Sequence, residues 1–299
     1  MVTLFHNVSH YITSLLFLLC ISLNTQHYAN ASNFALLIGI SNYPQFEVPN
    51  ASWDSIHGSN DIELLSPTLK KRGFYIKELT EENATASNIR KAFADLLTQI
   101  TNGDLVYIHF SGHGQPYEDN SGDETDGWDE AFIPFDAQHC YHKDYMGRNH
   151  ILDDELELFV NELRLKTGTS GYVYVVLDAC HAGGASRGEN ASKYIRGTNK
   201  GFSPNNKKFA PTIDRRGHLS IKSTPNMSGI CYIEACRSYQ TNTEIKENNK
   251  YYGPLTFYIN ESLKVNDFSN NSNWLSSVLF SMTKDRRLIS QNPVIETDK

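Results

Sequence analysis

Five short runs rich in apolar residues constrain the fold of this chain most strongly. They are NFALLIGI (Asn33–Ile40), FYIKEL (Phe74–Leu79), LVYIHF (Leu105–Phe110), YVYVVLD (Tyr172–Asp178) and ICYIEA (Ile230–Ala235). Runs of this length that are bounded by polar and glycine-containing segments are typical of strands buried on both faces of a sheet.

Segments with helical spacing separate these runs. One stripe is formed by Ile89, Phe93, Leu96, Leu97 and Ile100, and further helices are expected to begin at Asp153, Pro254 and Trp274. The spacing over Asn60–Lys71 is also helical, but Pro67 predicts that this segment splits, with Ser66 capping a second short helix. The alternation predicts an α/β fold with a mostly parallel central sheet covered on both faces.

The first 31 residues contain no acidic side chain, lysine or arginine. They include the apolar run LLFLLCISL (Leu15–Leu23), which is shorter than the roughly 20 residues that span a bilayer. Ala29-Asn30-Ala31 follows it in the A-x-A pattern of a cleavage site. We therefore expect a signal peptide over residues 1–31, a secreted or periplasmic protein and no stable membrane anchor. The alternative is an apolar N-terminus of a cytosolic protein.

The net charge argues against a nucleic-acid partner, and the cysteine spacing argues against two common cysteine motifs. The net charge of −7 disfavours nucleic acid. Beyond the predicted signal peptide the cysteines are Cys140, Cys180, Cys231 and Cys236, and no C-x-x-C pair occurs, which argues against a zinc knuckle or a thioredoxin-like motif. A disulfide from Cys140 to Cys231 or Cys236 stays open.

Two predicted strands end in residues that can carry chemistry. One runs into Ser111-Gly112-His113-Gly114, and the other runs into Asp178-Ala179-Cys180. Sites in parallel sheets form beyond the carboxyl ends of the strands, so His113 and Cys180 are expected to meet there as the base and the nucleophile of a thiol hydrolase. The backbone N–H groups of Gly114 and Cys180 are expected to bind the oxyanion.

Plainer interpretations exist for each of these residues. A buried cysteine alone is usually a small apolar residue, and a buried histidine alone is usually a packed one. A metal site at His109 and His113 is a further alternative, but strand geometry separates this pair by about 13 Å. The occurrence of Cys180 and His113 together, each in a turn of small residues, favours the catalytic pair.

Three motifs now identify a family. SGHG (Ser111–Gly114), DGWDEAFIPFD (Asp126–Asp136) and DACHAGG (Asp178–Gly184) together resemble the caspase-like cysteine peptidases, and most closely the metacaspases and their bacterial relatives. The resemblance covers residues 32–299 and implies a three-layer α/β/α sandwich with a Cys180/His113 dyad. It also implies a large-subunit-like part (32–187), a basic linker (188–224) and a small-subunit-like part (225–299).

The residue two positions before the cysteine indicates which bond is cut. Asp178 should share the face of Cys180, and a carboxylate there favours a cationic substrate side chain. The resemblance adds Asp61 and Ser111 as further walls of this pocket, so we expect cleavage after arginine or lysine. The alternatives are a turn or helix cap at Asp178 and a helix cap at Asp61.

Calcium is the one cofactor that the resemblance suggests, and the predicted chemistry does not require it. The matching ligands are Asp129, Asp153 and Asp154, while Arg187 stands where a further acid would be expected. A weak site therefore stays open. The alternative is that Asp153 and Asp154 stabilise the start of their helix.

The basic linker predicts self-cleavage. It carries Arg196, Lys208, Arg215 and Arg216, so an enzyme that cuts after basic residues could cut itself within Arg187–Lys222. A merely solvated loop is the alternative. The expected partners are protein or peptide substrates, and the resemblance favours a monomer. Two other functions stay open: a catalytically silent caspase-like binding or regulatory module, and a caspase-fold peptidase that cuts after asparagine or acidic residues.

Overall fold

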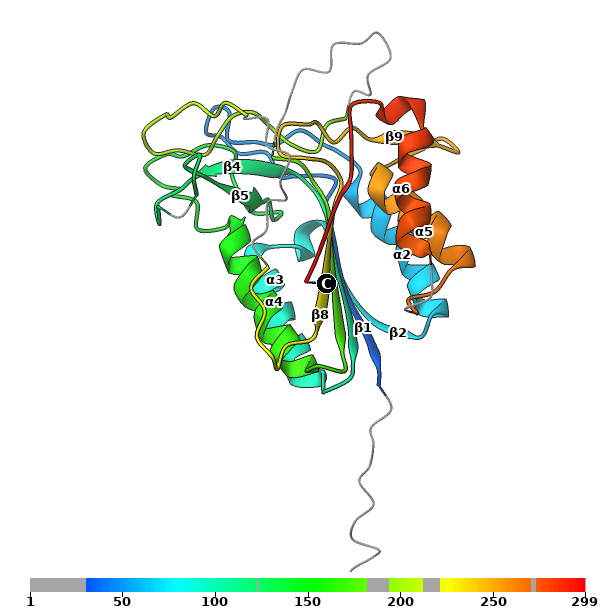
Figure 1. The fold of residues 1–299 in the computed structure, drawn as a ribbon. Helices are drawn as coiled ribbons and strands as arrows, with labels where there is room; N and C mark the ends of the chain where they lie inside the picture. Colours follow the sequence, from blue (N-terminus) through cyan, green and yellow to red (C-terminus); the bar gives the residue numbers. More distant parts are fainter. Residues whose placement is uncertain (1–30, 123, 182–193, 212–220, 270–272, 299) are drawn as a thin grey trace, which may run out of the picture. The chain divides into compact units, whose positions relative to one another are not determined.

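A six-stranded sheet forms the centre of the protein (Figure 1). The computed structural model describes residues 31–122, 124–181, 194–211, 221–269 and 273–298. The predicted signal peptide, residues 1–31, thus lies outside the described residues except for Ala31. The strand order is β11-β8-β7-β3-β1-β2. Its strands are β1 (Asn33–Gly39), β2 (Phe74–Thr80), β3 (Leu105–Ser111), β7 (Tyr172–Asp178), β8 (Gly229–Glu234) and β11 (Val294–Thr297).

Neighbouring strands are parallel except where β11 runs against β8. The predicted mostly parallel sheet is therefore confirmed, and the five predicted strands are all present. Strand β11 is too short and too polar to have been predicted from its sequence, VIET. Because β7 pairs with β8, the segments on the two sides of the basic linker share one sheet.

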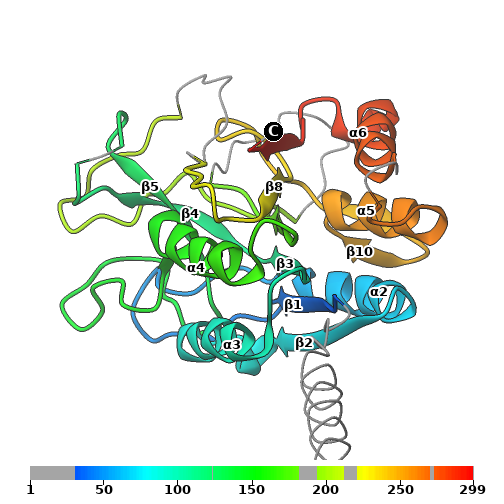
Figure 2. The ribbon, with the colours of Figure 1, turned by 60° about the horizontal axis from the view of Figure 1, so that its bottom comes forward.

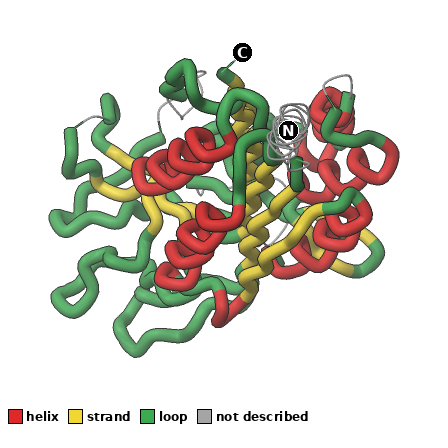
Figure 3. Tube along the Cα trace, turned by 90° about the horizontal axis from the view of Figure 1, so that it is seen from below, coloured by secondary structure: helices red, strands yellow, loops and turns green. Residues whose placement is uncertain are grey.

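Helices cover both faces of the sheet (Figures 1 and 3). On one face lie α3 (Ala86–Gln99) and α4 (Asp153–Thr167), and on the other lie α2 (Gly58–Lys71), α5 (Pro254–Val265) and α6 (Trp274–Lys284). Successive residues of β1 point to opposite faces, so Leu36 belongs to the core under α3 and α4, whereas Leu37 belongs to the core under α2, α5 and α6. The layered α/β/α arrangement implied by the resemblance is confirmed.

Helix α2 is continuous, so the predicted split at Pro67 is wrong. Pro67 lies on the exposed side of the helix, while Leu65 and Leu69 are fully buried on the other side. Burying a leucine contributes about 1.5–3 kcal/mol, so the apolar stripe outweighs a proline penalty of about 3 kcal/mol. Ser66 caps no second helix, because its hydroxyl donates to the carboxylate of Glu78.

Shorter elements extend from the ends of the sheet (Figure 2). A three-stranded sheet consists of β4 (Gly114–Glu118), β5 (Trp128–Phe132) and β6 (Ile151–Leu152), and a hairpin consists of β9 (Ile245–Glu247) and β10 (Lys250–Tyr252). Two 3-10 turns, η1 (Glu81–Asn83) and η2 (Arg286–Leu288), complete the described elements.

Two further findings concern cysteines and membranes. Cys140, Cys180, Cys231 and Cys236 form no disulfide in the part of the chain that the structure describes. Within the same part, every helix is too short or too polar to cross a bilayer.

Candidate active site

The carboxyl ends of β1, β3 and β7 converge at one edge of the sheet. Gly39 pairs with Ser111, and Ser111 pairs with Asp178, so the residues that follow these strands lie side by side. Helix α2 begins against this edge at Gly58, where a Cβ would lie 2.3 Å from the carbonyl oxygen of Ser111. Only glycine permits this approach, which brings the first turn of α2, with Asp61, to the strand ends.

His113 lies two residues beyond β3 in an aromatic cage. Trp53 stacks on its ring at 4.9 Å, and the hydroxyl of Tyr43 accepts a hydrogen bond from its backbone N–H at 3.0 Å. Its Nε2 lies 2.9 Å from the backbone carbonyl of Asp54, which can only accept, so Nε2 carries the proton of the neutral ring. The other nitrogen, Nδ1, is buried and has no hydrogen-bond partner among the described residues. Burial lowers the pKa of His113 to about 4, although the bond to Asp54 opposes this. The neutral ring thus presents a bare Nδ1 as a proton acceptor.

Cys180 lies two residues beyond β7, just as His113 lies two residues beyond β3. Its side chain is buried, and its thiol donates to the carbonyl oxygen of Gln240 at 2.7 Å. A second buried cysteine, Cys236, packs beside it, and its thiol lies 3.7 Å from the same carbonyl. The backbone of Cys180 touches Gly114, where a Cβ would lie 2.6 Å from the carbonyl oxygen of Cys180. The predicted nucleophile and the turn after the predicted base are therefore adjacent.

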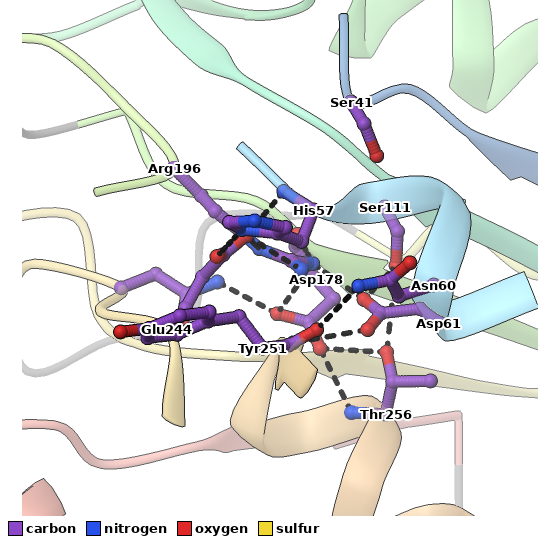
Figure 4. A network of polar contacts seen from close by, with 12 residues as sticks. Ser41, His57, Asn60, Asp61, Ser111, Asp178, Arg196, Glu244, Tyr251 and Thr256 are labelled. Carbon is purple, nitrogen blue, oxygen red and sulfur yellow. Dashed lines mark hydrogen bonds and ion pairs between the residues drawn. The ribbon is translucent and has the colours of Figure 1, made fainter. Parts of the chain in front are cut away.

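The predicted pocket residues also come together (Figure 4). The hydroxyl of Ser111 donates to Asp61 at 2.7 Å, and Asp61 and Asp178 are both fully buried. Asp61 lies inside α2 and does not cap it, so the helix-cap alternative is wrong. The cap alternative for Asp178 is correct in part, because its Oδ2 accepts from the backbone and the hydroxyl of Thr256 in the first turn of α5. Asp178 thus fixes α5 and lines the pocket at once.

The side chain of Arg196, from the linker, fills this pocket. Its guanidinium is fully buried, with Nη1 2.6 Å from Asp61 and 3.6 Å from Asp178. Burial alone would lower the pKa of Arg196, but the surrounding carboxylates outweigh it and raise the pKa. Burial likewise raises the pKa of Asp61 to about 7, against the opposing effect of the guanidinium. The carboxylates therefore keep the guanidinium charged, although its burial alone would favour the neutral form.

A third carboxylate, Glu244, completes the pocket. Its Oε1 lies 3.1 Å from Nε and 3.0 Å from Nη2 of Arg196, and its side chain is fully buried. The same carboxylate accepts from the backbone N–H of His57 at 2.7 Å. A planar guanidinium spans Asp61 on one side and Glu244 on the other, which the single ammonium of a lysine cannot do.

The backbone around Arg196 lies antiparallel to Asn242–Glu244 in a short pairing outside the named strands. Its N–H donates to the carbonyl of Asn242 at 3.0 Å, and the N–H of Glu244 donates to the carbonyl of Tyr194 at 3.1 Å. The carbonyl oxygen of Arg196 accepts from the N–H groups of Cys180, at 2.8 Å, and of Gly114, at 3.3 Å. These are the two donors predicted for an oxyanion. The carbonyl before the Arg196–Gly197 bond therefore lies beside the predicted nucleophile.

The predicted calcium ligands lie near one another, because Asp129 and Asp154 both act electrostatically on Asp153. Asp153 opens α4 and accepts from the backbone N–H of Glu130 at 3.2 Å, while Asp129 is buried in β5 and Asp154 follows in the first turn of α4. Burial, with Glu130 and Asp129 nearby, raises the pKa of Asp153 to about 8, which favours a neutral carboxyl. Among the described residues no group of three or more ligands is arranged to hold a metal ion. A weak calcium site at Asp129, Asp153 and Asp154 stays a prediction.

Of the other basic residues considered as cleavage positions, the structure describes Lys208. Lys208 is exposed, whereas Arg187, Arg215 and Arg216 lie outside the described residues. Within the predicted cleavage region, Arg187–Lys222, the basic residue that lies in the acidic pocket is therefore Arg196.

Several residues of the site were missed by the sequence analysis. Glu244 and Asn242 lie in the polar stretch after β8, where an acid ordinarily faces solvent. Trp53 and Tyr43 lie in the loop after β1, which has no periodicity. The segment that contains Glu244 and Asn242, IEACRSYQTNTE (Ile233–Glu244), resembles the small-subunit region of the caspase-like peptidases, but the resemblance assigns no roles within it.

Comparisons with known proteins agree with this architecture. The model of the caspase domain family matches residues 32–297. Metacaspase-1B of Aspergillus fumigatus is 34% identical over 162 residues, which is 50% of this chain and 35% of that protein. Metacaspase-7 of Arabidopsis thaliana is 31% identical over 161 residues, which is 50% of this chain and 34% of that protein. The match thus spans about a third of the length of these curated relatives.

The fold also resembles a solved structure. A crystal structure of a Geobacter sulfurreducens protein superposes with a TM-score of 0.62 at 18% identity, and the match covers 89% of this chain and 93% of that one. At this identity the likeness concerns the fold alone.

Proposed function

Because the chain belongs to the caspase domain family, we propose that it is a cysteine endopeptidase of the metacaspase type that cleaves after arginine or lysine. The observation that carries this proposal is the seating of Arg196. Its guanidinium fills an acidic pocket while its carbonyl oxygen accepts from the N–H groups of Cys180 and Gly114. An arginine in a substrate would occupy the same position.

The proposed reaction uses Cys180 and His113. The thiol leaves the carbonyl of Gln240, gives its proton to Nδ1 of His113, and its sulfur attacks the carbonyl carbon of the arginine. The N–H groups of Gly114 and Cys180 stabilise the oxygen as it becomes negative. His113 then protonates the leaving amine, and water hydrolyses the resulting thioester with His113 again as base.

Three carboxylates around one binding position support a cationic specificity. Asp61, Asp178 and Glu244 would repel an acidic substrate side chain. A neutral side chain would not balance the negative charge of these buried carboxylates. The two-sided contact of the guanidinium with Asp61 and Glu244 favours arginine over lysine. We therefore rank arginine first.

The first expected substrate is the linker itself. The bond between Arg196 and Gly197 follows the carbonyl held by the two donors, so autoprocessing there would create a new N-terminus at Gly197. Intact-mass measurement and N-terminal sequencing after prolonged incubation test this directly. Fluorogenic peptides that end in arginine, lysine, asparagine or aspartate test the specificity in parallel.

Each outcome of these two measurements has a clear meaning. Cleavage after Arg196 together with hydrolysis of the arginine peptide supports the proposal. Hydrolysis of the asparagine or aspartate peptide alone would replace the proposed specificity. A chain that stays intact and hydrolyses none of the four peptides would favour the catalytically silent binding module.

We propose no step through calcium, because the proposed chemistry of Cys180 and His113 does not require it. Equal peptide hydrolysis in excess chelator and in millimolar calcium would agree with this. A large activation by calcium would support the predicted weak site at Asp129, Asp153 and Asp154.

Export also belongs to the proposal. The signal peptide over residues 1–31 is supported by the sequence alone, and a secreted or periplasmic site of action follows from it. N-terminal sequencing of the protein from the exporting host checks this, and the expected first residue is Ser32.

A further inference from the structure

The extended linker segment contacts more than the acidic pocket. On the premise of the proposed function, we propose that the cleft contains a second specificity subsite, an aromatic slot for the side chain two positions before the cleaved arginine. The expected substrates therefore carry tyrosine, phenylalanine or tryptophan at that position.

The register of the bound segment defines which residue enters the slot. Arg196 pairs with Asn242, Ile195 bridges Thr243 in antiparallel fashion, and Tyr194 pairs with Glu244. Alternate residues of an extended segment point to the same side, so the side chains of Tyr194 and Arg196 lie on one side of the segment and that of Ile195 lies on the other. A substrate bound by the same main-chain contacts would place its own residue where Tyr194 lies.

Two aromatic rings form the slot. The ring of Tyr194 meets the ring of His57 edge-on at 4.5 Å and an interplanar angle of 90°, and it meets the ring of Tyr251 at 4.8 Å and 67°. His57 and Tyr251 stack on each other at 5.0 Å and 23°. Edge-to-face contacts of this kind are the preferred geometry of aromatic pairs.

The walls of the slot are fixed by the rest of the site. The second carboxylate oxygen of Glu244 lies 2.6 Å from Nδ1 of His57, while its first oxygen binds the guanidinium of Arg196. The side-chain amide of Asn60 donates to the carbonyl of Tyr251 at 3.0 Å, which ties β10 to the first turn of α2 (Figure 4). Glu244 therefore holds both the acidic pocket and one wall of the slot.

This geometry favours an aromatic occupant over an aliphatic one. A leucine could cover the same rings, but it has no polarised ring edge or face for the T-shaped contacts. A small residue such as alanine would leave both rings partly exposed to water. We expect the aromatic side chain to improve kcat/KM about tenfold over alanine, with leucine between them.

The test uses the full chain with Tyr194→Ala and Arg196→Ala, so that the linker does not compete with added peptides. The substrates are acetyl-Tyr-Ile-Arg, acetyl-Phe-Ile-Arg, acetyl-Leu-Ile-Arg and acetyl-Ala-Ile-Arg, each joined to a fluorogenic amine. We expect the tyrosine and phenylalanine peptides to exceed the alanine peptide about tenfold in kcat/KM. A tyrosine-to-alanine ratio within twofold would overturn the inference.

A matched pair of variants tests the wall. Tyr251→Ala should reduce the tyrosine-to-alanine ratio to about one. Tyr252→Ala is the control, because this neighbour on β10 packs against Phe257 at 6.1 Å, and it should leave the ratio near ten. A ratio that is unchanged in Tyr251→Ala would mean that the preference arises elsewhere.

Binding separates this inference from the proposed function. If none of the arginine peptides is hydrolysed, the proposed activity fails, and calorimetry with the corresponding peptide amides and a Cys180→Ala form of the same chain then measures the slot. About tenfold tighter binding of the tyrosine peptide than of the alanine peptide would keep the slot. Equal affinity, or no binding, would overturn it.

Discussion

Among the described residues, two arginines are almost completely buried, and their surroundings differ in charge. Arg164, on α4, is 1% exposed and binds the carboxylate of Asp298, the hydroxyl of Ser223 and the backbone carbonyls of Lys222 and Ser228. Arg196, in the linker, is 0% exposed and faces Asp61, Asp178 and Glu244.

The difference indicates which arginine is an anchor and which is a ligand. Among the described residues, one carboxylate and several neutral oxygens balance Arg164, so its site would carry little charge if emptied. The site of Arg196 combines three carboxylates with one cation, and without a guanidinium these acids would repel one another. A pocket with excess negative charge is suited to an arginine that comes and goes.

The largest expected effect concerns cleavage, which we propose for the bond after Arg196. Cys180→Ala should abolish both autoprocessing after Arg196 and hydrolysis of arginine peptides, with a loss of at least about 10⁴-fold, because the nucleophile is gone. Mass spectrometry and peptide kinetics measure this. Cys231→Ala is the matched control, since Cys231 is buried within β8 in the core under α2, α5 and α6, and it should retain activity. Cleavage that survives in Cys180→Ala would disprove the assigned nucleophile.

The next effect separates them by stability. Arg164→Ala should lower the free energy of unfolding by about 3 kcal/mol or more, because it leaves Asp298 and buried carbonyls without their partner. Chemical denaturation measures this. Millimolar benzamidine, a soluble amidine cation, should raise the melting temperature of Arg196→Ala by mass action and leave that of Arg164→Ala unchanged. Equal rescue of both variants would contradict the distinction.

The third effect separates their carboxylates. Asp61→Asn should lower kcat/KM for arginine peptides about a hundredfold, because a buried charge partner of the guanidinium is lost. Asp298→Asn should weaken folding and spare peptide hydrolysis per folded molecule. Comparable kinetic losses in the two variants would show that Asp61 acts through stability rather than through substrate.

The smallest effect is a dependence on pH. The pKa of Asp61 is about 7 with a guanidinium beside it, and an empty pocket lacks that opposing effect, so in the free protein the carboxyl is already gaining its proton when the pH reaches about 7 from above. Protonation removes the negative charge that attracts arginine, and kcat/KM should therefore fall by up to tenfold per pH unit below this value. The pKa of His113 is about 4, so the base itself should limit the rate only at much lower pH. Asp61→Asn should flatten the profile between pH 6 and 8; an unchanged profile would assign the decline to another group.

The regular parts of the fold were predictable because local pattern and tertiary burial agree there. The strands and the helices over Ala86–Gln99 and Asp153–Thr167 follow from periodicity alone. Pro67 was misjudged because a single local rule was set against a buried stripe that only the folded chain reveals. The short strands β4, β5, β6 and β11 are defined by their partners rather than by their own sequences.

The site divides in the same way. His113 and Cys180 could be named because each follows a recognisable strand by two residues. Glu244, His57 and Tyr251 could not, because their roles arise from contacts between segments separated by nearly 200 residues, such as the bond from His57 to Glu244. The seating of Arg196 was anticipated only as one basic residue among several in the linker.

The antiparallel pairing of Tyr194–Arg196 with Asn242–Glu244 carries a wider consequence for target choice. This pairing requires free backbone N–H and C=O groups, which in a helix or sheet are already hydrogen-bonded within the substrate protein itself. If the proposed function holds, an arginine with a suitable sequence around it could enter the cleft only after its segment has unfolded. We therefore expect the enzyme to cleave locally unfolded segments of other proteins, and to select among those segments by their side chains.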